Sequence, residues 1–327
     1  NKLNYYKDLD KISKELQEKV KILETTNSKM NKERADAHMT LNEMVGVTDE
    51  DTDAKGAYSE VDDTAFLTFN EFDVNAVPEL GYQEDQYYLH TDWLVKYANK
   101  KIREDNIKNV VIDLSANVGG VVLVEEYIES WICGSAHSIE RNTVDGSVTE
   151  ITHKADVNSD GKYDENDYLS SDINVYCMVT PCSFSCGNLL PSRLKDFSNT
   201  KFIGDRSGGG CCTIEQFRFL PVGGMFNFSS WHNSLTKDWR TNGGKTVDDG
   251  VEADFLKIGL DSESIKDYCD YSKIVQAIHN AKLALILIFD YFRDRFEIFF
   301  RLRCNILMEG CILSHGYKIK TNWKRPT

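Results

Sequence analysis

The sequence predicts an α/β fold, and two observations lead to that prediction. The first is a pair of continuous apolar runs at residues 110–114 and 175–179, which are typical of strands buried on both faces of a parallel sheet. The second is that each run precedes a turn and then apolar residues at helical spacing, which predicts a helix after each strand. This recurrence of strand, turn and helix is the pattern of α/β proteins.

The other elements follow in chain order. Apolar residues recur every three or four positions in residues 8–32, and this spacing predicts an amphipathic helix. Residues 48–56 are acidic and rich in turn formers, so we expect a solvated linker there. A short aromatic-rich run at residues 65–69 indicates a strand. We also expect a helix at residues 91–103, strands near residues 213–219 and 225–229, and a helix from about residue 274.

The length and charge of the chain limit its partners. With 327 residues it can form one large domain or two smaller ones. The formal net charge of -14 argues against a nucleic-acid partner and against an anionic membrane surface. Residues 283–289 are apolar, but charged residues follow directly, and the run is too short to span a bilayer. The nine cysteines lack the spacing of a zinc site.

We expect three parts in the chain. Residues 1–58 form an N-terminal helical segment with the acidic linker, and residues 59–281 form the core. The core carries an insertion at about residues 145–172. Residues 282–327 form an atypical extension, which ends in a basic stretch although the protein as a whole is acidic.

An acidic loop in the insertion has the spacing of a calcium site. Calcium loops use side-chain oxygens at positions 1, 3, 5, 9 and 12, a glycine at 6 and a main-chain carbonyl at 7. The matching residues are Asp156, Asn158, Asp160, Lys162, Asp164 and Asp167. Asp167 is shorter than the usual glutamate, so we expect weak binding, and the alternative is an acidic turn without metal. A single copy favours a structural calcium ion over a calcium switch.

Ser185 lies between the second apolar run and the helix that follows it. Backbone N–H groups are unpaired at the start of a helix, and the helix dipole is positive there, so a developing negative charge is stabilised. This position suits a nucleophile. Serine is also a favoured N-cap residue, so this segment alone leaves both interpretations open.

Four motifs in order resemble those of the C-terminal processing (tail-specific, tricorn-core-like) serine peptidases. Residues 110–120 resemble the family's hydrophobic strand followed by Asp-Leu-x-x-Asn-x-Gly-Gly, and residues 183–188 resemble its nucleophile motif. Residues 203–210 resemble the following glycine-rich strand, and residues 250–254 resemble Gly-Val-x-Pro-Asp with Ala253 in place of proline. The insertion and the Phe-Ser-Cys-Gly-Asn sequence are similar to a branch of the family in anaerobic Gram-positive bacteria.

The resemblance implies a crotonase/ClpP-like α/β core, a polypeptide substrate and no cofactor for catalysis. It implies Ser185 as the nucleophile and an oxyanion hole formed by the backbone N–H groups of Gly119 or Gly120 and of Cys186. It also suggests an extracellular or cell-envelope location. The segment before residue 59 is too short for the PDZ domain that many members carry, and the motifs leave the oligomeric state open.

Two departures from the family concern the general base. Many members use a lysine on the glycine-rich strand, where this chain has Gly209 or Gly210. Others use a histidine in an Asp-x-His context, which here occurs at His38. If His38 is only a surface residue, the base lies upstream of Asn1, or the chain is an inactive peptide-binding or calcium-stabilised scaffold. A further alternative is Cys186 as a thiol nucleophile.

Overall fold

The structure is a computed structural model that describes residues 56–73, 91–210, 212–214, 218–219, 224–226, 229–261 and 263–284, with Lys14 and Lys21. Lys14 and Lys21 are helical, and the rest of the helix predicted at residues 8–32 lies outside the described residues. The chain divides into two compact units, Asn1–Ser272 and Lys273–Thr327. In the second unit, residues 273–284 are helical. The predicted domain boundaries at residues 58 and 281 stay predictions.

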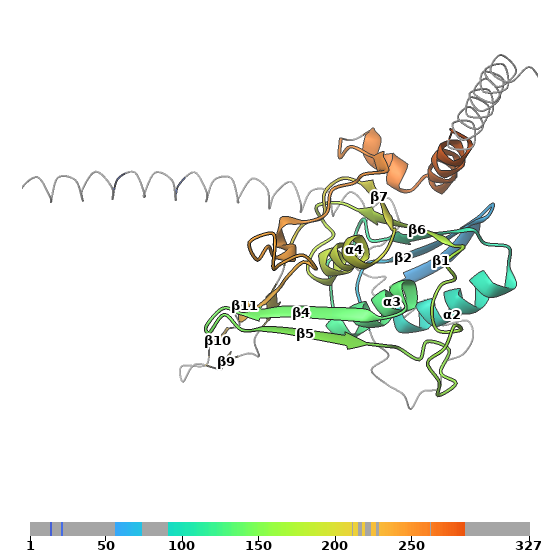
Figure 1. The fold of residues 1–327 in the computed structure, drawn as a ribbon. Coiled ribbons are helices and arrows are strands. Elements are labelled where there is room, and N and C mark those ends of the chain that lie inside the picture. Colours follow the sequence, from blue (N-terminus) through green and yellow to red (C-terminus); the bar gives the residue numbers. More distant parts are fainter. Residues whose placement is uncertain are drawn as a thin grey trace, which may run out of the picture. The chain divides into compact units, whose positions relative to one another are not determined.

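The first unit is built on a six-stranded sheet (Figure 1). Its strands, in spatial order, are β1 (Gly56–Val61), β2 (Thr64–Phe69), β3 (Asn109–Asp113), β6 (Asn174–Val179), β7 (Lys201–Gly204) and β12 (Leu256–Lys257). β1 runs antiparallel to β2, and the remaining neighbours are parallel. Ile112 of β3 pairs with Leu67 on one side and Cys177 on the other.

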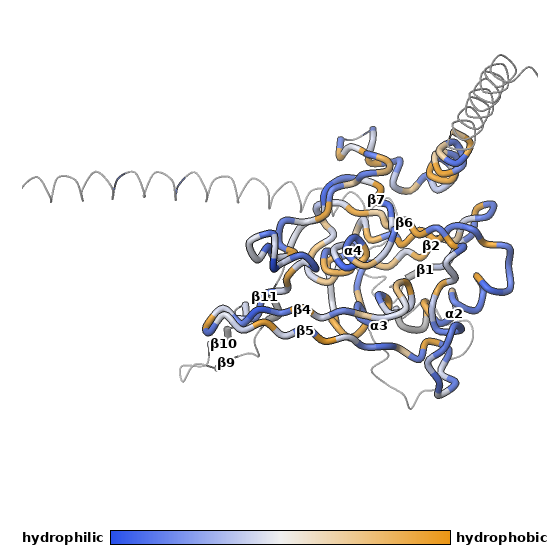
Figure 2. The backbone as a smooth tube through the Cα atoms, viewed as in Figure 1, coloured by the Kyte–Doolittle hydropathy of each residue, from blue (hydrophilic) through white to orange (hydrophobic). Residues whose placement is uncertain are grey.

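The continuous apolar runs form the middle of this sheet, as predicted. Every residue of β3 is buried, and the last four residues of β6 are buried as well. Figure 2 shows β6 as a largely hydrophobic segment inside a mostly hydrophilic outline. Burial on both faces explains why the runs do not alternate between apolar and polar residues.

Three described helices pack beside the sheet: α2 (Thr91–Glu104), α3 (Val122–Cys133) and α4 (Cys186–Phe197). α3 packs against both α2 and α4, and Trp131, Leu190 and Leu194 are fully buried there. α3 follows the turn after β3, and α4 follows the turn after β6. Both helices therefore begin at the carboxyl ends of parallel strands, which is where α/β proteins place their ligands.

A second, four-stranded sheet has the order β5 (Val148–His153), β4 (Ala136–Asn142), β11 (Ser229–Ser234) and β8 (Cys212–Ile214). The strand expected at residues 213–219 is divided between β8 and β9 (Arg218–Phe219), and the one at 225–229 between β10 (Met225–Phe226) and β11. β9 pairs with β10. Short 3₁₀ helices occur at η3 (Val247–Asp249) and η4 (Ser264–Tyr268). The mixed α/β fold is confirmed, and the described residues contain no PDZ domain.

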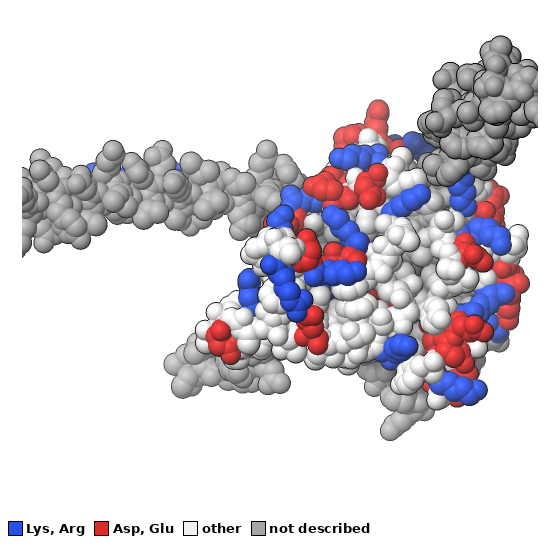
Figure 3. All heavy atoms as spheres, viewed as in Figure 1, with Lys and Arg blue, Asp and Glu red and all other residues white. Residues whose placement is uncertain are grey.

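Figure 3 shows acidic and basic side chains interspersed on the visible face. Among the described residues, no helix combines the length and apolarity that crossing a membrane requires.

Candidate active site

Ser185 occupies the turn between β6 and α4 in a strained conformation. Its φ is 55° and its ψ is -121°, although it is not a glycine. It stands at the N-cap position of α4, yet its side chain makes no capping hydrogen bond. The interpretation of Ser185 as a simple helix cap is therefore wrong. A half-buried hydroxyl is left at the positive end of a helix.

Backbone hydrogen bonds hold the serine turn on both sides. The Phe184 N–H donates to the Asn117 carbonyl at 3.1 Å, and the Ser185 N–H donates to the Gly209 carbonyl at 3.1 Å. Ser183, two residues earlier, is fully buried, and its hydroxyl donates to the Leu114 carbonyl at 2.7 Å. Because these acceptors follow β3 or lie on the glycine-rich segment, the turn is fixed by two of the motifs found in the sequence.

Gly119 and Gly120 approach the serine turn and the end of β2 more closely than any side chain would allow. A Cβ added to Gly119 would lie 2.6 Å from the Ser185 Cβ. A Cβ added to Gly120 would lie 2.3 Å from the Phe72 carbonyl oxygen. Both glycines have positive φ, 112° and 139°, so another residue would be strained as well as obstructed.

The backbone N–H groups beside Ser185 differ in whether they are occupied, that is, whether they already donate a hydrogen bond within the described residues. The Gly119 N–H donates to Asn117 Oδ1 at 2.9 Å. The N–H groups of Gly120 and Cys186 make no hydrogen bond within the part of the chain that the structure describes. Gly120 and Cys186 are neighbours, because the Cys186 thiol donates to the Gly120 carbonyl at 3.2 Å. Two such donors can stabilise an oxygen that gains negative charge.

The Cys186 thiol is poorly suited to act as a nucleophile. Cys186 is 2% exposed, and its thiol already donates to Gly120. Burial raises the pKa of this thiol to about 12, so the reactive thiolate is scarce at neutral pH. These observations favour Ser185 over Cys186.

At the family's lysine position, Gly209 leaves no room for a side chain and Gly210 leaves little. A Cβ at Gly209 would lie 2.5 Å from the Asp248 carbonyl oxygen, and one at Gly210 would lie 3.0 Å from the Ser185 nitrogen. Both have positive φ, 83° and 96°. The backbone in this segment is therefore shaped for glycine, in agreement with the absence of a lysine from its sequence.

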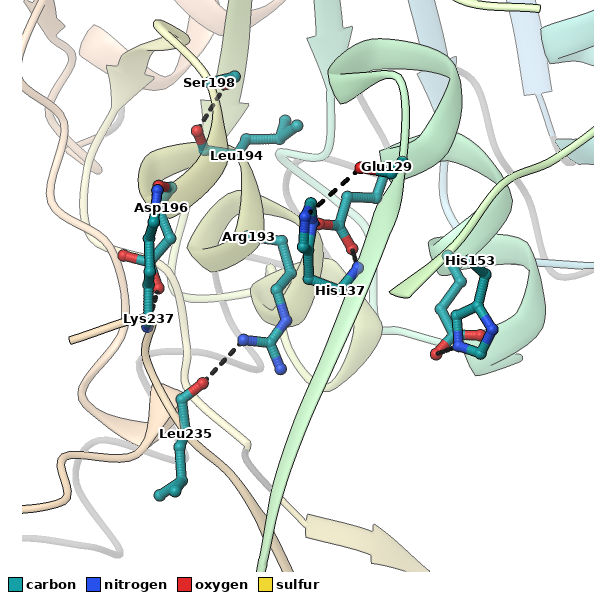
Figure 4. A network of polar contacts seen from close by, with 11 residues as sticks. Glu129, His137, His153, Arg193, Leu194, Asp196, Ser198, Leu235 and Lys237 are labelled. Carbon is teal, nitrogen blue, oxygen red and sulfur yellow. Dashed lines mark hydrogen bonds and ion pairs between the residues drawn. The ribbon is translucent and has the colours of Figure 1, made fainter. Parts of the chain in front are cut away.

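The sequence offered His38 as the base, and the chain contains six further histidines. His38, His90 and His315 lie outside the described residues. No histidine hydrogen bonds to the Ser185 hydroxyl among the residues that the structure describes. His137 on β4 faces Glu129 of α3, with its Nδ1 2.8 Å from the Glu129 Oε1 (Figure 4). The His137 ring also stacks on Phe197, with 3.7 Å between the ring centroids.

Three buried charged residues lie between α3 and α4 and were not expected from the sequence. Glu125 is 1% exposed, Glu129 0% and Arg193 2%. Burial raises the pKa of Glu129 to about 8 and raises that of Glu125 well above its usual range. One oxygen of Glu125 has no hydrogen-bond partner. Arg193 donates to the Leu235 carbonyl at 2.7 Å (Figure 4), and its charge acts against these two shifts.

The acidic loop at residues 156–167 uses its carboxylates to bind its own backbone. Asp156 accepts hydrogen bonds from the N–H groups of Asp160 at 3.0 Å and Gly161 at 2.8 Å. The buried Asp167 accepts from Val157 at 2.9 Å and from Asp164 at 2.8 Å. Gly161 has φ 82°, as the sharp turn of a calcium loop requires.

The residues predicted as calcium ligands are only partly brought together. No group of three or more acidic, histidine or cysteine side chains within the described ranges is close enough to hold a metal ion. A calcium loop also uses oxygens at positions 3 and 7, which here are the Asn158 side chain and the Lys162 carbonyl. The backbone turn therefore fits the calcium loop, while the carboxylates are engaged with backbone N–H groups.

Comparison with known proteins points to one family. The model of the family described as Peptidase family S41 matches residues 63–256, which is more than half of the chain. A comparison with curated proteins gives no match.

Among the solved structures that match this chain is the photosystem II D1 C-terminal processing protease, which is 14% identical. The match covers 62% of this chain and 45% of that chain, with a TM-score of 0.43. Mature CPAF is 15% identical, with 69% and 55% covered and a TM-score of 0.46. A lipoprotein from Streptococcus agalactiae is 13% identical, with 68% and 72% covered and a TM-score of 0.46. The chain thus spans about half the length of the first two structures.

Proposed function

Because this chain belongs to peptidase family S41, we propose that it is a serine peptidase that hydrolyses peptide bonds through an acyl-enzyme on Ser185. The observation that carries the proposal is the conformation of Ser185, a non-glycine residue with φ 55° whose hydroxyl does not cap the helix that it precedes. Backbone strain of this kind collects at functional sites.

The proposed oxyanion hole consists of the N–H groups of Gly120 and Cys186. Ser185 Oγ attacks the carbonyl carbon of the substrate, and the carbonyl oxygen gains the negative charge that these N–H groups stabilise. Each such donor contributes about 100- to 1000-fold in rate. Gly119 takes part through its missing side chain, because a Cβ there would collide with Ser185.

A base must take the proton from Ser185 and return it to the amine that leaves when the C–N bond breaks. A water molecule then hydrolyses the ester in the same way. We propose His38 for this role, since it stands in the Asp-x-His context of the family. His38→Ala should then abolish turnover at neutral pH. Unchanged turnover would place the base on another segment.

The proposed substrate is an extended polypeptide that lies along the edge of the sheet beside Ser185. Membership of a peptidase family supports the polypeptide substrate. We further propose an extracellular or cell-envelope location and a place in the anaerobic Gram-positive branch of the family. The proposed location rests on the family resemblance, and the proposed branch rests on the insertion and the nucleophile motif.

The test uses a fluorophosphonate probe, which phosphonylates activated serines. The full-length protein should be labelled, peptide mapping should place the adduct on Ser185, and Ser185→Ala should remove the label. Ser147→Ala is the control, because Ser147 is exposed in the turn after β4 and its hydroxyl donates to Asp145 within that turn. It should keep the label. An unlabelled full-length protein would contradict the peptidase proposal and favour the inactive peptide-binding scaffold.

We also propose a structural calcium ion in the loop at residues 156–167. The turn at Gly161 and the order of oxygen-bearing residues support it. A ligand that binds only the folded state raises its stability. Added calcium should therefore raise the thermal midpoint and EGTA should lower it, whereas an unchanged midpoint in both cases would leave an acidic turn without metal.

A further inference from the structure

Asn117 connects the three segments that surround Ser185. Its side chain is fully buried. Its Nδ2 donates to the Phe69 carbonyl at the end of β2 at 2.9 Å, and its Oδ1 accepts the Gly119 N–H at 2.9 Å. Its backbone carbonyl accepts the Phe184 N–H at 3.1 Å. One residue thus links β2, the glycine turn and the serine turn.

The first turn of α4 lies directly against Asn117. A Cβ added to Gly187 would lie 2.6 Å from the Asn117 carbonyl oxygen and 2.8 Å from its Oδ1. Gly187 follows Cys186, and Gly120 follows Gly119. The unoccupied Cys186 N–H is therefore one residue from Gly187, which lies against Asn117. The unoccupied Gly120 N–H is one residue from Gly119, whose N–H bonds to Asn117.

Asn117 also determines which glycine N–H is unoccupied. Because its Oδ1 holds the Gly119 N–H, that group is directed into the turn and away from any ligand. The Gly120 N–H has no such partner among the residues that the structure describes. Donors that are fixed in advance stabilise a transition state without reorganising when the charge develops.

We propose that Asn117 is a positioning residue that sets the separation and direction of the Gly120 and Cys186 N–H groups. The inference rests on the proposed function, since it concerns the oxyanion of that reaction. Interactions made only in the transition state change kcat and leave KM nearly unchanged. Loss of Asn117 should therefore lower kcat with little change in KM.

If Asn117 had only a structural role, its loss would give a different result. The chain contains a second buried asparagine that serves for this comparison. Asn109 begins β3, at the opposite end of the strand that Asn117 follows, and it is also fully buried. Its Nδ2 donates to Asp63 Oδ1 at 2.9 Å and to Thr64 Oγ1 at 3.1 Å. Asn109→Ala thus removes a similar set of buried hydrogen bonds without touching the serine turn.

The experiment compares full-length wild type, Asn117→Ala, Asn117→Ser and Asn109→Ala. It measures kcat and KM with a p-nitrophenyl ester, together with the rate of fluorophosphonate labelling and the thermal midpoint. Both alanine variants should lose stability. Asn117→Ala should lower kcat and the labelling rate by about 100-fold with KM within about twofold, whereas Asn109→Ala should keep both rates within about twofold of wild type.

Asn117→Ser keeps the inference testable if the alanine variant does not fold. A serine hydroxyl can accept the N–H two residues later, so it retains the bond to Gly119 but loses the bond to Phe69. If both Asn117 variants fold, the kcat of Asn117→Ser should lie between the kcat of wild type and the kcat of Asn117→Ala. If only the serine variant folds, its kcat should lie below the kcat of both wild type and Asn109→Ala. An Asn117 variant that behaves like Asn109→Ala would overturn this inference alone. A wild-type protein that reacts with neither probe would overturn the proposed function and this inference together.

Discussion

The serine turn and the acidic loop are both sharp turns, but they differ in whether their backbone N–H groups have hydrogen-bond acceptors. In the acidic loop, Asp156 and Asp167 accept hydrogen bonds from N–H groups within the loop. Beside Ser185, the Gly120 and Cys186 N–H groups have no acceptor within the described residues. Unpaired backbone groups are costly when water cannot reach them.

This difference distinguishes a loop that supports itself from one that is prepared for a ligand. Carboxylates that accept hydrogen bonds from the N–H groups of their own loop contribute to folding stability. They leave none of these N–H groups available to a substrate. Two unoccupied donors next to a strained serine lower stability locally but suit an anion that forms during a reaction. Changes in the serine turn should therefore affect rate first, and changes in the acidic loop should affect stability first.

The largest effect is expected from Gly119→Ala, which places a methyl group 2.6 Å from the Ser185 Cβ. Displacement of Ser185, the proposed nucleophile, should reduce the labelling rate by about 100- to 1000-fold. Gly146→Ala is the matched control, since Gly146 also has positive φ, 76°, but would meet no atom within 4 Å. Gly146→Ala should introduce backbone strain of the same kind but should not lower the labelling rate. Equal rates in the two variants would contradict the account.

Glu129, one of the buried acids between α3 and α4, predicts that the free energy of unfolding depends on pH. Burial raises the pKa of Glu129 from 4.5 to about 8, so between these values the folded protein holds a proton that the unfolded chain has lost. The contribution is fully present below pH 4.5 and is lost as the pH rises to 8. The free energy of unfolding should fall by up to about 1.4 kcal/mol per pH unit in this window.

Urea unfolding from pH 5 to 8 measures this dependence. Glu129→Gln keeps a neutral group at all pH values and should flatten the decline. Glu150→Gln is the control, because the Glu150 side chain is 41% exposed and pairs with Arg240 at the surface. A decline of the same slope in wild type and Glu129→Gln would exclude Glu129 as its source.

In the acidic loop, Asp167→Ala should lower stability without changing the labelling rate. Asp167 is 4% exposed and accepts backbone hydrogen bonds from Val157 and Asp164, so its loss leaves buried N–H groups unpaired at a cost of about 1–3 kcal/mol each. Glu165→Gln, on the exposed side of the same loop, should change neither quantity. A large fall in labelling rate for Asp167→Ala would show that the two loops are not independent.

The smallest effect is expected from Cys186→Ala. The backbone N–H of residue 186 remains, and the substitution removes the thiol's hydrogen bonds to the Gly120 carbonyl and to the Ser185 side chain. The labelling rate should stay within about tenfold of wild type, which is well below the loss expected for an oxyanion donor. Complete loss of labelling would restore the thiol as a candidate nucleophile.

The sequence was informative wherever one segment determined its own structure. The apolar runs of β3 and β6, the helices that follow them and the glycines around Ser185 were all predictable, because burial and backbone shape leave local patterns. The β4–β5 hairpin was missed because its strands are mostly polar, although Asp145-Gly146 at its turn is a hairpin signal.

Features that depend on two distant segments were not predictable. Glu125, Glu129 and Arg193 are charged helix residues that would ordinarily face water, and only the packing of α3 on α4 buries them. The sequence likewise left Gly119 and Gly120 as equal candidates. The hydrogen bond from the Gly119 N–H to Asn117 Oδ1 separates them.

The most direct test of the central claim is a crystal structure of the full-length protein with a phosphonate bound to Ser185. The account predicts a phosphoryl oxygen about 2.7–3.1 Å from the backbone nitrogens of both Gly120 and Cys186, with the Gly119 N–H still bonded to Asn117. A phosphoryl oxygen bound instead to the Gly119 nitrogen, or held by neither Gly120 nor Cys186, would contradict it.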